Sequence, residues 1–113
     1  MSAITTHVLD TARGLPAAGV SVVLDLHVGG AWKRLGTGIT DADGRLRTLL
    51  PAGAPLTGGT YRLVFDTGAW FSAQGVAAFY PEVQIVFAVR DAGAHHHVPL
   101  LLSPFGYSTY RGS

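Results

Sequence analysis

Three side chains of this sequence offer the most useful chemistry: His7, Arg45 and His97. An imidazole titrates near neutral pH, so a histidine can take up or release a proton under ordinary conditions. A guanidinium presents a planar fork of donors that suits anionic or electron-rich groups. The three residues lie far apart in the chain, so their use depends on the elements that position them.

Three consecutive histidines, His95, His96 and His97, could also bind a metal ion. On a strand only His95 and His97 share a face, and two imidazoles leave a first-row metal short of ligands. No Asp, Glu or Cys of matching parity lies nearby. The segment Asp41–Gly44 resembles part of a calcium loop, but the other ligand positions and the closing Glu are missing. We therefore expect a plain turn at Asp41–Gly44, and neither a metal nor a cofactor.

Alternating apolar and polar residues predict β-strands along most of the chain. The predicted strands are Ile4–Asp10, Val20–Val28, Trp32–Thr37, Arg45–Leu50, Tyr61–Phe65, Val83–Val89, His96–Leu102 and Tyr107–Arg111. The segment Ala69–Phe79 lacks this alternation, is rich in Ala and stops before Tyr80-Pro81, so we expect one short helix there. About eight short strands separated by turn residues predict an antiparallel sandwich or barrel, and the length fits one domain over residues 1–113.

The same alternation predicts the direction of the chemically useful side chains. Val98, Leu100 and Leu102 share one face of their strand, so His97 points away from the core. The same alternation of side chains predicts that His7 points outward on the first strand and that Arg45 points outward on the Arg45–Leu50 strand. On that last strand the residues expected to face inward are Leu46, Thr48 and Leu50.

Composition indicates that part of the surface is covered by other copies of the chain. Only 13% of the residues are charged, against roughly 25% in an average soluble domain. Leu9, Pro99 and Leu101 share the outward faces of His7 and His97, although apolar side chains suit water poorly. We expect an outer sheet face that is buried in an assembly, with a polar pocket inside the seam.

Several function classes find no support in the sequence. The net charge of +1 and the lack of a basic stripe argue against nucleic acid and anionic membranes as partners. Without cysteine there is no disulfide, thiolate nucleophile or cysteine-ligated zinc. No serine lies in a Gly-x-Ser-x-Gly elbow. The segment Met1–His7 has no signal-peptide pattern, and no stretch approaches the ~20 apolar residues of a membrane helix, so we expect a cytoplasmic protein.

Four segments carry a recognisable pattern: His7–Ala17, the Asp43–Arg45 turn, His95–Pro104 and the closing Tyr107–Ser113. Together they resemble the transthyretin superfamily and, within it, the branch of 5-hydroxyisourate hydrolases. The hormone carriers of this superfamily have lysine where His7 stands, and they lack the closing Tyr110-Arg111-Gly112-Ser113. The chain therefore resembles the hydrolases over nearly its whole length.

The resemblance implies a fold, an assembly and a reaction. The fold would be a transthyretin-like sandwich of two four-stranded antiparallel sheets with one short helix. The assembly would be a homotetramer with its sites at the dimer–dimer interface. The substrate would be 5-hydroxyisourate, a small product of urate oxidation. Water would open its six-membered ring to give 2-oxo-4-hydroxy-4-carboxy-5-ureidoimidazoline.

The resemblance also implies roles for individual residues. His97 would be the base that takes a proton from water, with the hydroxyl or carboxylate of Ser113 assisting. His7 would orient the water or protonate the departing ring nitrogen. Arg45 would bind the heterocycle through its fork of donors. Tyr110 would close the channel into a shallow pocket.

Two other function classes stay open. A transthyretin-like carrier of an aromatic ligand would use the same channel, although an open channel conflicts with Tyr110 as a plug. A structural or carbohydrate-binding sandwich would need an exposed aromatic platform, and it gives no reason for His7, Arg45 and Ser113 to occur together. Turnover of freshly generated 5-hydroxyisourate separates these classes from the hydrolase.

Overall fold

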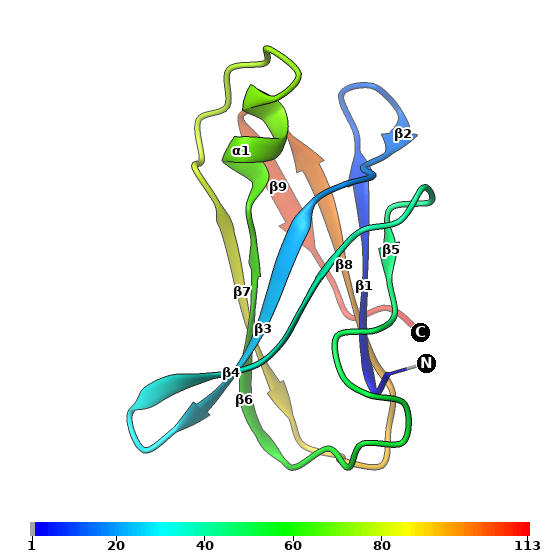
Figure 1. Cartoon of the computed structure of the whole chain (residues 1–113), viewed down its shortest axis with the longest axis vertical. Helices are drawn as coiled ribbons and strands as arrows, with labels where there is room; N and C mark the ends of the chain where they lie inside the picture. Colours follow the sequence, from blue (N-terminus) through cyan, green and yellow to red (C-terminus); the bar gives the residue numbers. More distant parts are fainter. Residues whose placement is uncertain (1) are drawn as a thin grey trace.

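The computed structural model describes residues 2–113 as a sandwich of two sheets with one short helix (Figure 1). The strands of the first sheet are β1 (Ile4–Asp10), β2 (Leu15–Pro16), β5 (Arg45–Leu46), β8 (His96–Ser103) and β9 (Gly106–Thr109). Those of the second sheet are β3 (Ser21–Val28), β4 (Ala31–Ile39), β6 (Gly59–Phe65) and β7 (Val83–Val89), and α1 (Thr67–Ser72) joins β6 to β7. This confirms the predicted fold class.

The order of the strands places β1 and β8 at the centre of the first sheet. Its main path is β2-β1-β8-β9, and β5 also pairs with β1. Because β8 pairs with β1 along its whole length, β2 and β5 share the opposite edge of β1. The second sheet has the order β4-β3-β6-β7. Strand β9 is therefore one edge of the first sheet, and β7 is one edge of the second sheet.

The core lies between the two sheets, where the alternating strands direct their apolar residues. The inward residues of β8, Val98, Leu100 and Leu102, are all buried as predicted. From β1, Ile4 and Val8 join them without any exposed surface. Burying one such side chain completely contributes about 1.5–3 kcal/mol, so this alternation also fixes which face of each strand is outward.

The detailed prediction of two four-stranded antiparallel sheets differs from the structure in the first sheet. Counting two short strands, that sheet has five members, and β1 runs parallel to β8. The alternation of side chains is the same in parallel and antiparallel pairs, so the sequence pattern could not distinguish these arrangements. Within residues 2–113, no helix is long and apolar enough to cross a membrane.

The predicted strand Arg45–Leu50 was wrong beyond its second residue. Strand β5 ends at Leu46, Thr48 is exposed and Leu49 is buried, so the expected inward set is lost. The backbone leaves β1 here and packs on β4, where a Cβ on Gly36 would lie 1.8 Å from the Leu49 carbonyl oxygen. Such a close approach requires glycine, and it pulls the chain out of the period-two pattern.

The predicted helix Ala69–Phe79 was misplaced, because α1 covers Thr67–Ser72. The helix ends in a Schellman motif, in which the Val76 N–H donates to the Phe71 carbonyl and the Gly75 N–H to the Ser72 carbonyl. Gly75 has φ of 71°, a left-handed conformation that glycine adopts without strain. Gly75 therefore ends the helix well before Tyr80-Pro81, which the prediction took as the stop signal.

Candidate functional site

The first sheet brings the three predicted side chains onto adjacent strands. His97 on β8 lies opposite Thr5 of β1, and Arg45 on β5 lies opposite His7 of the same strand. Residues that face each other across a ladder point to the same side of the sheet. His7, Arg45 and His97 therefore share the outer face, as the alternation predicted, and the register adds that they are neighbours.

A polar hollow of about 180 Å³ lies on this outer face. The residues that line it are Thr5, Thr6, Arg45, Arg47, His95, His97 and Ser113. Within residues 2–113, the guanidiniums of Arg45 and Arg47 have no ion-pair or hydrogen-bond partner. The hollow thus joins two imidazoles to two cationic groups whose donors are unused.

The turn between β4 and β5 positions Arg45. The Asp41 carboxylate accepts hydrogen bonds from the backbone N–H groups of Asp43 and Arg45, at 2.9 and 3.0 Å. These bonds stabilise the charged form, and the bond from Arg45 is the main reason that the pKa of Asp41 lies below its usual value. Gly44 supplies the left-handed residue, with φ of 75°. The segment Asp41–Gly44 is therefore the plain turn that we expected.

Thr5 connects two histidines in the wall of the hollow. Its Oγ1 lies 2.7 Å from Nδ1 of His97 and 2.9 Å from Nε2 of His95. Thr5 itself is only 3% exposed, and the two imidazole rings stack with their centroids 6.2 Å apart. Within the described residues, Nε2 of His97 has no hydrogen-bond partner. That nitrogen is therefore available to a molecule in the hollow.

The segment after β9 holds Ser113 beside His97. The Gly112 N–H donates to the carbonyl of His97 at 2.8 Å, and a Cβ on Gly112 would lie 2.5 Å from Cδ2 of that imidazole. Only glycine lets the backbone pass so close to the ring. The same segment helps to bury Pro99, since that Cβ would also lie 3.3 Å from its Cγ. Pro99 thus needs no assembly to cover it, contrary to our expectation for this part of the outer face.

The surroundings of His97 favour its neutral form. Burial is the main cause that lowers the pKa of His97, and the positive charges of His95, Arg45, His7 and Arg47 lower it further. At neutral pH the ring is consequently uncharged and can accept a proton. The role of His97 as a base stays a prediction.

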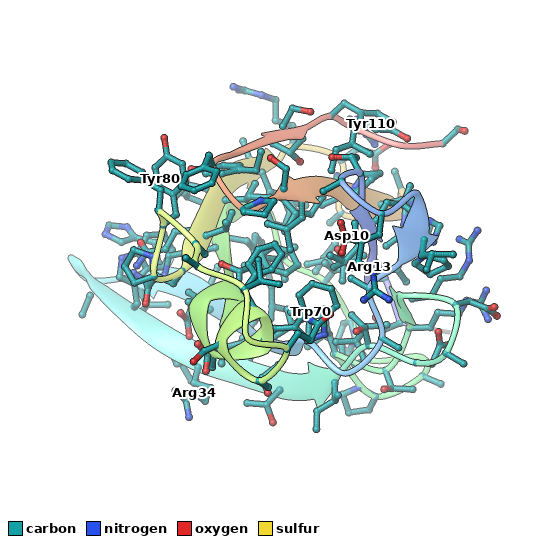
Figure 2. All side chains as sticks on the ribbon, turned by 90° about the horizontal axis from the view of Figure 1, so that it is seen from above. Asp10, Arg13, Arg34, Trp70, Tyr80 and Tyr110 are labelled. Carbon is teal, nitrogen blue, oxygen red and sulfur yellow. The ribbon has the colours of Figure 1, made fainter. Side chains whose placement is uncertain are left out.

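Two predicted site residues lie outside the polar hollow. The Nε2–H of His7 donates to the carbonyl of Asp43 at 2.8 Å, which ties this ring to the β4–β5 turn. Tyr110 lines a second, apolar hollow of about 250 Å³ between β7 and the β8–β9 pair, and its side chain is 57% exposed. Figure 2 shows Tyr110 on the last segment of the chain, at the upper edge of the view. The roles of His7 and Tyr110 remain predictions.

Four residues of the hollow were not predicted as site residues: Thr5, Thr6, Arg47 and His95. Thr5 lies two positions before His7 on the same strand face, a signal that was available. As a site residue, His95 was considered only as a metal ligand. Arg47 lies past the end of β5, where parity no longer applies. Within residues 2–113, no group of three or more His, Asp or Glu side chains is placed to hold a metal ion.

Comparison with known proteins places this chain in a family. The family model described as "HIUase/Transthyretin family" matches residues 4–112. The chain belongs to that family. Its relatives include the 5-hydroxyisourate hydrolase of Mesorhizobium japonicum, 51% identical over 97% of this chain and 91% of the relative. The 5-hydroxyisourate hydrolase of Salmonella typhi is 46% identical, over 97% of this chain and 80% of the relative.

Solved structures of this family include both hydrolases and transthyretins. The 5-hydroxyisourate hydrolase of Klebsiella pneumoniae superposes with a TM-score of 0.85 at 42% identity, covering 97% of this chain and 98% of the other. Transthyretin from Sparus aurata superposes with a TM-score of 0.90 at 33% identity, covering 99% and 97%. The backbone fits the transthyretin slightly better, whereas the sequence is closer to the hydrolase. The fold alone therefore does not distinguish the two kinds of protein.

Proposed function

We propose that this chain hydrolyses 5-hydroxyisourate to 2-oxo-4-hydroxy-4-carboxy-5-ureidoimidazoline, a step of urate breakdown. The observation that carries the proposal is the polar hollow, which joins a neutral imidazole to two guanidiniums with unused donors. The names of the bacterial relatives, which are identical to this chain at about half of the aligned positions, support the same substrate.

His97 is the proposed base. The oxygen of a water molecule attacks a ring carbonyl carbon of the substrate, and the water proton moves to Nε2 of His97. The bond between that carbon and the ring nitrogen then breaks, the carbon becomes a carboxylate, and the nitrogen takes up a proton. A nucleophilic water needs no covalent intermediate, which agrees with a site that lacks cysteine.

The two arginines are proposed to bind the heterocycle and the developing oxyanion. A guanidinium without a protein partner keeps its whole fork of donors for the ligand. Arg45 held by the β4–β5 turn is the main candidate, and Arg47 on the rim of the same hollow is the second. Ser113 lies beside them and is proposed to orient the water through its hydroxyl.

A homotetramer is the proposed setting for His7 and Tyr110, with sites at the dimer–dimer interface. Two observations support an assembly. Within residues 2–113, strands β7 and β9 each have a neighbouring strand on one side only, so the backbone groups of their other side are unpaired. Exposed apolar side chains also lie on or near these edges, including Phe79, Val86 and Tyr110. A neighbouring copy would narrow the open polar hollow, and in that setting we assign Tyr110 to closing it and His7 to protonating the leaving nitrogen.

The hydrolase is favoured over a carrier of an aromatic ligand by the chemistry of the hollow. A carrier needs an apolar channel, whereas four of the seven side chains that line this hollow are arginine or histidine. One solved transthyretin relative binds thyroxine, so thyroxine is a suitable probe for the alternative function.

The test is turnover of freshly generated 5-hydroxyisourate. We expect saturable acceleration of its decay over buffer, with a magnetic resonance spectrum that shows the ring-opened carboxylate as the first product. Sedimentation should give a species of about four chain masses, as in D₂ tetramers of homo-oligomers. Thyroxine binding without any turnover would replace the hydrolase with a carrier.

A further inference from the structure

We propose that Thr5 is a positioning residue for His97, and that the Thr5 hydroxyl donates its proton to His95. In this arrangement His97 carries its proton on Nδ1 and presents the lone pair of Nε2 to the hollow. The kinetic consequence rests on the proposed hydrolase function. The protonation pattern is a property of the chain itself and can be measured separately.

The Thr5 hydroxyl carries a single proton. A hydroxyl donates one hydrogen bond and accepts others, so Thr5 can donate to only one of its two imidazole partners. In one arrangement Nδ1–H of His97 donates to Thr5, and Thr5 donates to Nε2 of His95. In the reverse arrangement His95 donates, Thr5 donates to Nδ1 of His97, and the proton of His97 lies on Nε2.

The groups around Nε2 of His97 decide between these two arrangements. Arg45 and Arg47 line this space and offer only hydrogen-bond donors. A lone pair on Nε2 is compatible with such surroundings, whereas an N–H there would face further positive donors. His95 does not oppose this choice, because its ring is exposed and water can satisfy either form. The first arrangement is therefore the favoured one.

Only the arrangement with the His97 proton on Nδ1 leaves a usable base. A neutral imidazole with its proton on Nε2 has no lone pair on that nitrogen and cannot take a proton from water there. Thr5 lies on β1, opposite His97 of β8, and is buried, so water cannot easily replace its hydroxyl. The hydrogen bond at 2.7 Å thus fixes both the tautomer and the rotation of the His97 ring.

The chain provides a matched control in Thr40, which does not line the hollow. Both threonines are buried, and both use the side-chain hydroxyl in a hydrogen bond to another segment. The Thr40 hydroxyl, however, donates to the carbonyl of Ala17 at 2.6 Å and not to a histidine. Replacing either threonine with valine keeps the volume and removes one hydroxyl. Only the Thr5 substitution should alter the histidines.

The kinetic experiment compares these variants at equal concentrations of folded protein. We expect Thr5→Val to lower kcat roughly tenfold, the equivalent of one ordinary hydrogen bond, with KM nearly unchanged. Thr5→Ser should restore most of the rate, because it returns the hydroxyl. Thr40→Val should lower the melting temperature but change kcat by no more than about twofold. Equal rates for Thr5→Val and Thr40→Val would overturn the proposal.

A second experiment reads the tautomer directly. Long-range ¹H–¹⁵N spectra of histidine-labelled protein, at a pH where the rings are neutral, should show His97 protonated on Nδ1. In Thr5→Val the proton should move in part to Nε2. His95→Gln should preserve the wild-type pattern, because the amide oxygen can accept from Thr5 in place of Nε2.

The two experiments separate failure of this inference from failure of the proposed function. A wild-type protein that hydrolyses 5-hydroxyisourate with His97 protonated on Nε2 would overturn the role of Thr5 and leave the hydrolase in place. A protein with the expected tautomer but without turnover would support the positioning and overturn the hydrolase.

Discussion

The outer faces of the two sheets use their polar residues in opposite ways. On the second sheet, Nε and one terminal nitrogen of Arg62 donate to the same carboxylate oxygen of Asp25, at 3.1 and 2.7 Å. The Arg62 guanidinium also lies 4.4 Å from the centre of the Trp32 ring. On the first sheet, Arg45 and Arg47 border a hollow and have no such partners within residues 2–113.

This difference separates a structural arginine from a binding one. A guanidinium that is held by a carboxylate and an aromatic ring has satisfied its charge and keeps few free donors. A guanidinium beside a hollow retains the donors that a ligand needs. Both kinds of arginine lie on an outer strand face in the sequence pattern, so residue type and parity do not distinguish them. The partners that the fold supplies distinguish the two kinds of arginine.

The largest expected effect is on the histidines of β8. His97→Asn should lower hydrolysis of 5-hydroxyisourate by roughly 100- to 10,000-fold, because it removes the proposed base. His96→Asn is the matched control. His96 is only 4% exposed and faces the core, with its Nδ1–H bound to the carbonyl of Ala94, so it should affect stability and spare the chemistry. Equal loss of activity in both variants would contradict the assignment of His97.

The next effect tests the two outer faces against each other. Arg45→Gln should lower kcat/KM by roughly 100-fold, as expected when a group that stabilises developing charge is removed. Arg62→Gln removes the same charge from the second sheet and should change kcat/KM by no more than about twofold. Steady-state kinetics of both variants would decide this, and similar losses would show that Arg45 acts through net charge alone.

The stability of the two variants should follow the reverse order. Arg62→Gln should lower the free energy of unfolding by about 2 kcal/mol, because it leaves the buried Asp25 carboxylate without its charged partner. Arg45→Gln should leave stability within about 0.5 kcal/mol of the wild type, since it breaks no internal bond. Urea unfolding followed by circular dichroism measures both. An unchanged midpoint for Arg62→Gln would mean that its ion pair contributes little.

A smaller effect concerns the segment that covers His97. Gly112→Ala should lower kcat roughly tenfold, because the new methyl group would lie 2.5 Å from Cδ2 of His97 and displace the ring. Gly106→Ala is the control, since the nearest atom to its added Cβ is 3.7 Å away. The same rate for both alanine variants would show that the ring tolerates the displacement.

The smallest effect is on the pH profile. His97 acts in its neutral form, and burial together with the charges of His95, Arg45, His7 and Arg47 lowers its pKa. The fall of kcat/KM on acidification should therefore have its midpoint below the usual histidine value of about 6.5. Arg47→Gln removes one positive charge, which raises the pKa of His97 and should move this midpoint to higher pH. A shift to lower pH would have the wrong sign for this account.

Much of the fold could be predicted from local patterns. The strands with strict alternation, β1 and β8, have the predicted inward and outward faces, because burial of one face determines them. The errors lie where backbone geometry overrides alternation. The chain turns away after Leu46 to pack over Gly36, and the left-handed Gly75 ends α1 early. Gly75 was a visible stop signal, whereas the approach of Leu49 to Gly36 joins distant segments and leaves no local pattern.

By itself, the sequence determined which residues could do chemistry and which way three of them point. Residue type defines what His97 and Arg45 can exchange with a ligand, and a period of two defines the face of a strand. The tertiary structure decided which of them meet. Strand register, a long-range property, placed Thr5 beside His97, and close packing of Gly112 on the same ring placed Ser113 at the hollow. Thr5 and His97 are 92 positions apart in the sequence, and no local pattern encodes the distance between such residues.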